Sequence, residues 1–278
     1  MTTHMEAEAL LRAMGERPDE AIDLGEAALL LGSFDRPRVG LQRYRDHLAA
    51  LADDTAAMLR ERGDGGLADR IAALNAVIVG RYGYAGDTLT YDDLQNANLL
   101  RVIDRRKGLP VALGILYLST AERLGWQMAG LNFPGHFLVR LDLGGARAIL
   151  DPFDRGRPRG APELREMLKA AAGPGAELAA RHYAPVGKRE VLLRLQNNIK
   201  VRRLKAGDLA GALASIEDML RLVPDAAPLW REAGLVNERL DRPRAAIACL
   251  ERFLAFRPGG EAETQARAAL AGIRTRLN

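Results

Sequence analysis

The feature that most constrains this chain is an apolar segment over residues 108–125, "GLPVALGILYLSTAERLG". Pro110 suits the first position of a helix, where its missing N–H group is not needed, and Gly125 suits the position after the last turn. Between them, residues 111–120 are apolar on nearly every face of the expected helix. A helix that is apolar all round is a buried one. The sequence therefore predicts a buried helix that begins at Pro110.

After this helix the apolar residues change from helical to alternating spacing, which is typical of strands. The strand candidates cover residues 128–131, 136–142 and 148–151. Gly144-Gly145 lies between the last two, and paired glycines favour the tight turn of a β-hairpin. We therefore expect a small antiparallel sheet after the buried helix.

The hairpin brings a histidine and a carboxylate toward each other. A two-residue loop at Gly144-Gly145 leaves His136 diagonal to Asp151 on the same face of the sheet, whereas a loop centred one residue earlier places them directly opposite. Only a loop with an odd number of residues would put them on different faces. We therefore expect the imidazole and the carboxylate to meet.

The rest of the chain is mainly helical. Helices are expected near residues 19–30, 37–61, 67–80 and 94–105, and one more at 161–172 within a Pro- and Gly-punctuated stretch. The sequence thus predicts four parts. They are a helical region packed on the core (1–80), the core (81–160), a linker (161–187) and helical repeats (188–278).

The C-terminal part contains a 34-residue repeat, because Pro224 and Pro258 and the apolar positions before them recur at that offset. The second copy, with Trp230 and Gly234, resembles the tetratricopeptide pattern. The first copy is degenerate, and Lys200 replaces a small residue there. A last helix over residues 261–277 would form the cap. Trp230 is interpreted mainly as packing between repeat helices, with ligand contact as the alternative.

Composition limits the classes of function. The chain is 48% hydrophobic and 27% charged, as is typical of globular proteins, and no apolar run approaches the roughly 18 residues of a membrane span. Its formal charge is +4, but the short basic clusters lack interleaved aromatic residues, which disfavours nucleic acid as a partner. The single cysteine, Cys249, excludes an internal disulfide and a multi-cysteine zinc site. Without a signal-peptide pattern, the expected location is cytoplasmic.

Three motifs carry a family resemblance: Arg-Arg-Lys-Gly-Leu-Pro at 105–110, Phe-Pro-Gly-His-Phe-Leu-Val-Arg at 133–140 and Asp-Pro-Phe at 151–153. Together they resemble the transglutaminase-like superfamily, specifically its bacterial SirB-type branch, which often carries C-terminal tetratricopeptide repeats. The resemblance implies an α+β fold. A helical N-terminal region and a papain-like core with a small antiparallel sheet would precede an all-α tetratricopeptide module.

The resemblance also implies a catalytic triad. In active members a cysteine opens the buried helix, a histidine begins the next strand and an aspartate ends the following one. A helix N-terminus lowers the pKa of a thiol, the histidine takes its proton and the carboxylate orients the imidazole. Carried over residue by residue, the histidine is His136, the aspartate is Asp151 and the nucleophile position is Pro110. Proline has no nucleophile, and Ser119 lies about 14 Å further along the helix axis.

The leading hypothesis is therefore a non-catalytic, regulatory or binding protein that needs no cofactor and no metal. A protein or peptide partner would bind in the repeat groove or in the vestigial cleft. Asn96, Arg105 and Trp230 are the candidate binding residues, although loop bracing also accounts for the first two. The alternative is a hydrolase or amidase in which His136 acts as general base, Asp151 orients it and the nucleophile is not a cysteine. No membrane partner is expected, and the partner's identity and the oligomeric state stay open.

One further expectation concerns the charged loop after the aspartate. The run Arg155-Gly-Arg157-Pro-Arg159 is interpreted as a solvated loop.

Overall fold

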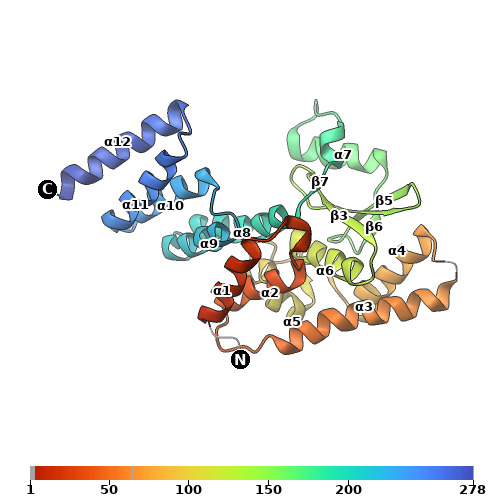
Figure 1. Ribbon diagram of the computed structural model, residues 1–278. Coiled ribbons are helices and arrows are strands. Elements are labelled where there is room, and N and C mark those ends of the chain that lie inside the picture. The colour runs from red at the N-terminus through yellow and green to blue at the C-terminus, as the bar shows by residue number, and fades with distance from the viewer. Residues whose placement is uncertain (1–3, 64, 278) are drawn as a thin grey trace. The chain divides into compact units, whose positions relative to one another are not determined.

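The computed structural model describes residues 4–63 and 65–277, which divide into two compact units (Figure 1). The first unit contains residues 17–195 together with the first helix up to Leu10. The second contains residues 11–16 and the chain from Gln196 onward. Each unit is described separately below.

The secondary structure follows the sequence prediction in its order. The helical segments before the sheet are α1 (His4–Gly15), η1 (Asp19–Ala21), α2 (Leu24–Phe34), α3 (Gln42–Arg62), α4 (Leu67–Asn75), η2 (Ala76–Arg81), η3 (Leu94–Ala97), α5 (Leu99–Arg105) and α6 (Pro110–Arg123). The strands are β1 (Ala85–Gly86), β2 (Lys107–Gly108), β3 (Gln127–Leu131), β4 (Val139–Leu143), β5 (Ala146–Asp151), β6 (Arg157–Pro158) and β7 (Pro185–Val186). The later helical segments are α7 (Ala161–Ala172), η4 (Ala180–Tyr183), α8 (Lys188–Lys205), α9 (Leu209–Leu222), α10 (Ala227–Arg239), α11 (Pro243–Ala255) and α12 (Gly260–Leu277).

Over the described part of the chain, no helix combines the length and the apolar character that crossing a membrane would require.

Helix α6 is the buried helix that the sequence predicts. Pro110 occupies its first turn, every residue from 110 to 121 is buried, and Gly125 beyond its end has a φ of +68°. The helix packs against α2, α3 and β3. Gly114 permits a close approach of the sheet, because a Cβ at this position would clash with the ring of Phe137. The central helix and the residues next to His136 are therefore tightly packed on each other.

The sheet has five antiparallel strands in the order β6-β5-β4-β3-β7. In the β4–β5 hairpin Leu143 pairs with Ala146 across Gly144-Gly145, whose φ angles of 57° and 84° suit a type I′ turn. This is the first of the two registers that the sequence left open. Strand β4 begins at Val139, so His136 lies in the loop just before the strand rather than inside it.

The prediction of a linker over residues 161–187 is wrong. Helix α7 lies within it, and its Leu164 and Leu168 are buried in a cluster with Leu138 and Ile149 of the sheet region. Strand β7 then joins the sheet beside β3. The prolines and glycines of this stretch mark turns between packed elements, so it belongs to the core of the first unit.

The helix expected over residues 94–105 is interrupted at Asn98. The Asn98 side chain accepts hydrogen bonds from the N–H groups of Leu100 and Arg101, so it caps α5 and separates it from η3. Its amide also donates to the carbonyl of Gly32 at 2.9 Å, which ties α5 to α2. The cap at Asn98 therefore divides the expected helix into η3 and α5.

The second unit has the helix order expected for the repeats. Helices α8 and α9 form the first pair, α10 and α11 the second, and α12 follows as the last helix. Gly234 on α10 lets α11 approach closely, since a Cβ there would lie 2.7 Å from Cγ of Leu250. In the degenerate first copy, the buried ammonium group of Lys200 is neutralised by Glu232 at 2.6 Å.

Candidate functional site

The structure brings the two predicted polar residues of the hairpin together. Nε2 of His136 lies 2.8 Å from Oδ1 of Asp151, which ends β5. The His136 side chain is 21% exposed, whereas that of Asp151 is 3% exposed. The imidazole of His136 is therefore partly exposed, whereas the carboxylate that it contacts is buried.

Asp151 has several further partners. Its Oδ1 accepts hydrogen bonds from the backbone N–H groups of Phe153 at 3.1 Å and Asp154 at 3.2 Å. Its Oδ2 accepts from the guanidinium of Arg159, with Nη2 at 2.9 Å and Nε at 3.3 Å. Burial acts to raise the pKa of Asp151, but the hydrogen bond and charge of His136 and the guanidinium of Arg159 lower it below its ordinary value. Asp151 is thus held ionised.

Sequence reasoning missed Arg159. The arginine run after Asp151 was interpreted as a solvated loop, but the side chain of Arg159 is only 16% exposed and its Nη2 also contacts Asp154 at 2.6 Å. Burial works to lower the pKa of Arg159, and the two carboxylates raise it above its ordinary value. In the sequence Arg159 is only one of three arginines after Asp151, and nothing in that pattern shows that β6 pairs with β5 and so brings Arg159 to the carboxylate.

This arrangement fixes the tautomer of His136. An ionised carboxylate can only accept, so a proton lies on Nε2, and in the neutral imidazole Nδ1 presents a lone pair. Nδ1 has no hydrogen-bond partner among the described residues. The guanidinium of Arg159 is shared between Asp151 and Asp154. The geometry therefore orients the imidazole of His136 through a carboxylate that is itself held by an arginine.

A residue of α8 holds the loop that carries His136. Nη2 of Arg194 donates to the backbone carbonyls of Phe133 at 3.1 Å and His136 at 2.5 Å. Its guanidinium also lies 5.4 Å from the centre of the Phe137 ring, and burial lowers the pKa of Arg194. Sequence analysis did not single out Arg194, because the loop is about sixty residues away along the chain, a range at which periodicity carries no signal.

Aromatic rings connect His136 to the start of α6. The ring of Phe153 meets the imidazole edge-on at 6.1 Å, and Tyr91 meets Phe153 in the same way at 5.7 Å. Phe153 lies against Gly86, where a Cβ would be 2.6 Å from the ring. Gly86 pairs in turn with Gly108, two residues before Pro110. The rings thus lie beside the segment that leads to Pro110.

Three side chains of α6 carry hydroxyl groups, and that of Thr120 is buried without a hydrogen-bond partner among the described residues. The phenol of Tyr117 donates to Oδ1 of Asn75 at 2.8 Å, and burial together with the charge of Asp151 raises its pKa. Oγ of Ser119 lies against α2, where a Cβ added to Gly25 would be 2.6 Å from it. Cys249 belongs to the second unit, and burial raises the pKa of its thiol.

Asn96 and Arg105 brace the loop ahead of α6. Nη1 of Arg105 donates to Oδ1 of Asn96 at 2.9 Å, and Nη2 to Oδ2 of Asp87 at 3.0 Å. The amide of Asn96 donates to the carbonyl of Thr90 at 2.6 Å, and the residue is fully buried. Hydrogen bonds, those of Thr90 first, lower the pKa of Asp87 below its usual range. The polar groups of the two predicted binding residues, Asn96 and Arg105, are therefore used in hydrogen bonds that stabilise this loop.

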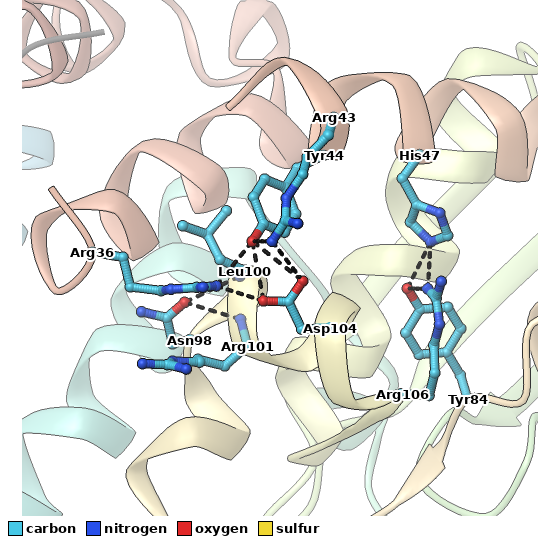
Figure 2. Close-up of polar contacts among 10 residues, drawn as sticks. All are labelled: Arg36, Arg43, Tyr44, His47, Tyr84, Asn98, Leu100, Arg101, Asp104 and Arg106. Carbon is cyan, nitrogen blue, oxygen red and sulfur yellow. Dashed lines mark hydrogen bonds and ion pairs between the residues drawn. The ribbon is translucent and has the colours of Figure 1, made fainter. Parts of the chain in front are cut away.

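The next arginine, Arg106, contacts His47 and Tyr84 (Figure 2). It adopts a left-handed conformation with a φ of 61° at the end of α5. Its Nη1 contacts the Tyr84 hydroxyl and lies 2.7 Å from Nε2 of His47. Since arginine only donates, Nε2 of His47 must accept, and its proton lies on Nδ1. Burial, and then the charge of Arg106, lower the pKa of His47 to about 4.

A second polar cluster in Figure 2 lies on the same pair of helices. The carboxylate of Asp104 on α5 accepts from Arg36 at 2.6 Å and from Arg43 on α3 at 3.0 Å. The hydroxyl of Tyr44 lies 3.1 Å from the same carboxylate. These contacts fasten α3 to α5, and so support the segment that leads to Pro110.

Trp230 combines packing with a position on a cavity. Its indole N–H donates to the carbonyl of Pro224 at 2.7 Å, and its ring packs against the apolar cluster between α11 and α12. It also lines a cavity of about 590 Å³ together with Leu220, Ala233 and Cys249. Cys249 is only partly buried and faces this cavity.

Over residues 4–63 and 65–277, no three histidine, cysteine or acidic side chains are grouped as a metal site would require. The carboxylates of Asp151 and Asp154 share Arg159, which would repel a cation placed between them.

Comparison with known proteins gives two matches to family models. A model of the transglutaminase-like superfamily matches residues 42–197, and a tetratricopeptide-repeat model matches residues 199–277. A UPF0162 protein of Xylella fastidiosa is 30% identical over 243 residues, which cover 86% of each chain. Protein SirB1 of Salmonella typhimurium is 24% identical over 210 residues, 75% of this chain and 76% of that one. F-box only protein 21 of Homo sapiens is 30% identical over 135 residues, 46% of this chain and 20% of that one.

Proposed function

We propose, for a chain that belongs to the transglutaminase-like superfamily in its SirB-type bacterial branch, that the ancestral thiol site is retained without its chemistry and that the protein acts by binding. Its partner is a protein or peptide, and its role is regulatory. The proposal keeps the cytoplasmic location expected from the sequence.

The domain organisation supports a binding role. A transglutaminase-like core followed by tetratricopeptide repeats fits a regulatory or binding module, since such repeats generally mediate protein–protein interaction. The cavity beside Trp230 offers a concave, partly apolar surface of the size that accommodates a few side chains. The repeat groove is therefore the first candidate for the binding surface, with Trp230 as its anchor.

The observation that carries the proposal is the residue type at the start of α6. Pro110 opens this helix with a ring that can neither ionise nor attack. The other two triad positions keep their residues, and His136 is hydrogen-bonded to Asp151 at 2.8 Å. The site therefore retains an oriented imidazole without a nucleophile at the helix start.

The second candidate is a hydrolase or amidase, and one observation favours it. His136 is oriented by Asp151, and its Nδ1 is available to accept a proton from water or from a nucleophile on the substrate. In this reading Asn96 and Arg105 shape the loop beside the site rather than contact the substrate.

One experiment separates the two functions. The purified protein and its His136→Ala variant are incubated with panels of amides, esters and thioesters, and products are followed by mass spectrometry. We expect no turnover by either protein. Turnover by the wild type that is lost in His136→Ala would establish the hydrolase and overturn the proposal.

The binding side is tested on a partner that has been captured and then purified. Its affinity should be unchanged by His136→Ala and lowered by Trp230→Ala, with Trp230→Phe as the control that keeps a packed ring. A loss with His136→Ala alone would move the binding surface from the repeats to the vestigial cleft.

A further inference from the structure

One edge of the five-stranded sheet is covered along only part of its length. On one side, β3 pairs with β4 from Gln127 to Gly130. On the other side, β7 pairs only with Gly130 and Leu131. Within the described chain, no strand pairs with residues 127–129 on that second side.

The chain itself explains why β7 stops. After Val186 it turns at Gly187 into α8, and the Asp19 carboxylate accepts hydrogen bonds from the N–H groups of Lys188 at 2.6 Å and Arg189 at 2.9 Å. A Cβ at Gly187 would lie 2.6 Å from the same carboxylate. Because this contact caps α8 directly after Val186, the chain enters the helix there, and β7 does not continue along β3.

The hydrogen-bond pattern shows which backbone groups are left. The N–H of Leu131 donates toward β4, to Leu138 at 2.9 Å, and the N–H of Asn132 donates to Ala184 at 3.1 Å on the β7 side. Because these directions alternate along an antiparallel strand, Met128 points its N–H and C=O to the β7 side, beyond the end of β7. An unpaired strand edge is a template for another strand.

A groove follows the same edge. It has a volume of about 510 Å³ and is lined by residues 126–130 of the β3 edge and by apolar side chains that include Leu24, Leu118, Val186 and Val191. Its rim carries three carboxylates, those of Asp19, Glu20 and Glu122, and one cation, that of Lys188.

Two of the three rim carboxylates already have partners. Glu122 is paired with Lys188, and Asp19 caps α8. The side chain of Glu20, an exposed residue, has no hydrogen bond or ion pair with the described residues. The rim therefore keeps uncompensated negative charge beside an apolar floor.

We propose that this β3 edge groove binds an extended segment of a partner protein in which an apolar residue is flanked by basic ones. The segment adds to the sheet through the N–H and C=O of Met128, places its apolar side chain in the groove and pairs a basic side chain with Glu20. The groove is lined by neither His136 nor Trp230, so this site stands whether or not the proposed function holds.

The test begins with selection of short random peptides displayed on phage against the full-length protein. Selected peptides are synthesised, and their affinity is measured by fluorescence anisotropy for the wild type, Glu20→Lys and Glu61→Lys. Glu61 is an exposed acid on α3 outside the groove and serves as the matched control. We expect basic and apolar residues to alternate in the peptides, with binding about tenfold weaker for Glu20→Lys and unchanged for Glu61→Lys.

A second measurement keeps the protein unchanged. Peptides with single N-methylated amides should lose binding at alternate positions, and hydrogen exchange at the Met128 amide should slow when the unmodified peptide binds. Failure to enrich any peptide, equal binding by Glu20→Lys, or unchanged exchange at Met128 would overturn the proposal. A dimer of the free protein that dissociates in Glu20→Lys would also overturn it, because the occupant would then be a second copy. Binding that survives His136→Ala and Trp230→Ala separates this site from the proposed function.

Discussion

Replacing Arg159 by methionine removes the guanidinium that the structure places against Asp151, and it keeps a side chain of similar length. If this contact balances the buried carboxylate as argued above, the variant must lose stability in the first unit. The wild-type contribution is fully present at pH 7, because the pKa of Asp151 is lowered in the folded protein and the contribution disappears only as the pH falls through that lowered value.

The magnitude follows from the contacts. Breaking a buried ion pair by removing one partner costs about 3–5 kcal/mol. Here the Asp151 side chain is 3% exposed and that of Arg159 is 16% exposed. Asp151 keeps hydrogen bonds from His136 and from two backbone N–H groups. We therefore expect a loss at or just below the lower limit of that range, about 2–3 kcal/mol for Arg159→Met, and about 1 kcal/mol for Arg159→Lys, which keeps the charge without the fork.

The assay is urea unfolding at pH 7 followed by tryptophan fluorescence. The chain has two tryptophans, Trp126 in the first unit and Trp230 in the second. In a Trp230→Phe background the signal therefore reports on the unit that contains Arg159. The partner control is Arg159→Met in an Asp151→Asn background, where the destabilisation should shrink by at least about 1 kcal/mol because the buried charge is gone.

Two outcomes would refute the reasoning. A change below about 0.5 kcal/mol for Arg159→Met would show that the contact is solvated in solution. An equal loss in the Asp151→Asn background would show that Arg159 stabilises the unit through its packing and not through the carboxylate.

Two other predictions concern helix packing and pH. Gly114→Ala should destabilise the first unit by about 1–3 kcal/mol, because the added Cβ meets the Phe137 ring. The control is Gly272→Ala on α12, which has open space around it and should be neutral or stabilising. Equal effects of the two substitutions in thermal unfolding would contradict the packing argument. His47 has a folded pKa of about 4 against an ordinary 6.5, so the unfolded chain binds more protons between these values and stability falls as the pH drops from 6.5 to 4. His47→Gln keeps an acceptor for Arg106 and should flatten that part of the melting-temperature profile; parallel profiles would disprove the assignment.

Local pattern was enough to predict the central helix and the hairpin. The apolar run after Pro110 fixed α6, and the paired glycines with alternating residues on both sides left only two registers, of which one is observed. The family resemblance is confirmed, and the fold class with it. These features depend on periodicity and turn chemistry, which act over a few residues.

The features that the sequence did not predict have two physical origins. Arg159 and Arg194 are charged side chains whose partners are set by tertiary folding, and their sequence neighbourhood looks like any solvated stretch. The supposed linker contained its own warning, because Leu164 and Leu168 are four residues apart and so share one face of a helix. Punctuation by proline and glycine was given more weight than that apolar spacing. The roles of the predicted binding residues stay predictions.

The guanidinium beside Asp151 has a consequence for anyone who would re-engineer this scaffold as an enzyme. The carboxylate that orients His136 also binds a permanent cation, so a thiol introduced at position 110 would join a scaffold whose carboxylate serves two partners. Removing Arg159 to leave the carboxylate to the imidazole alone would strand a buried charge, in whichever order the two substitutions are made.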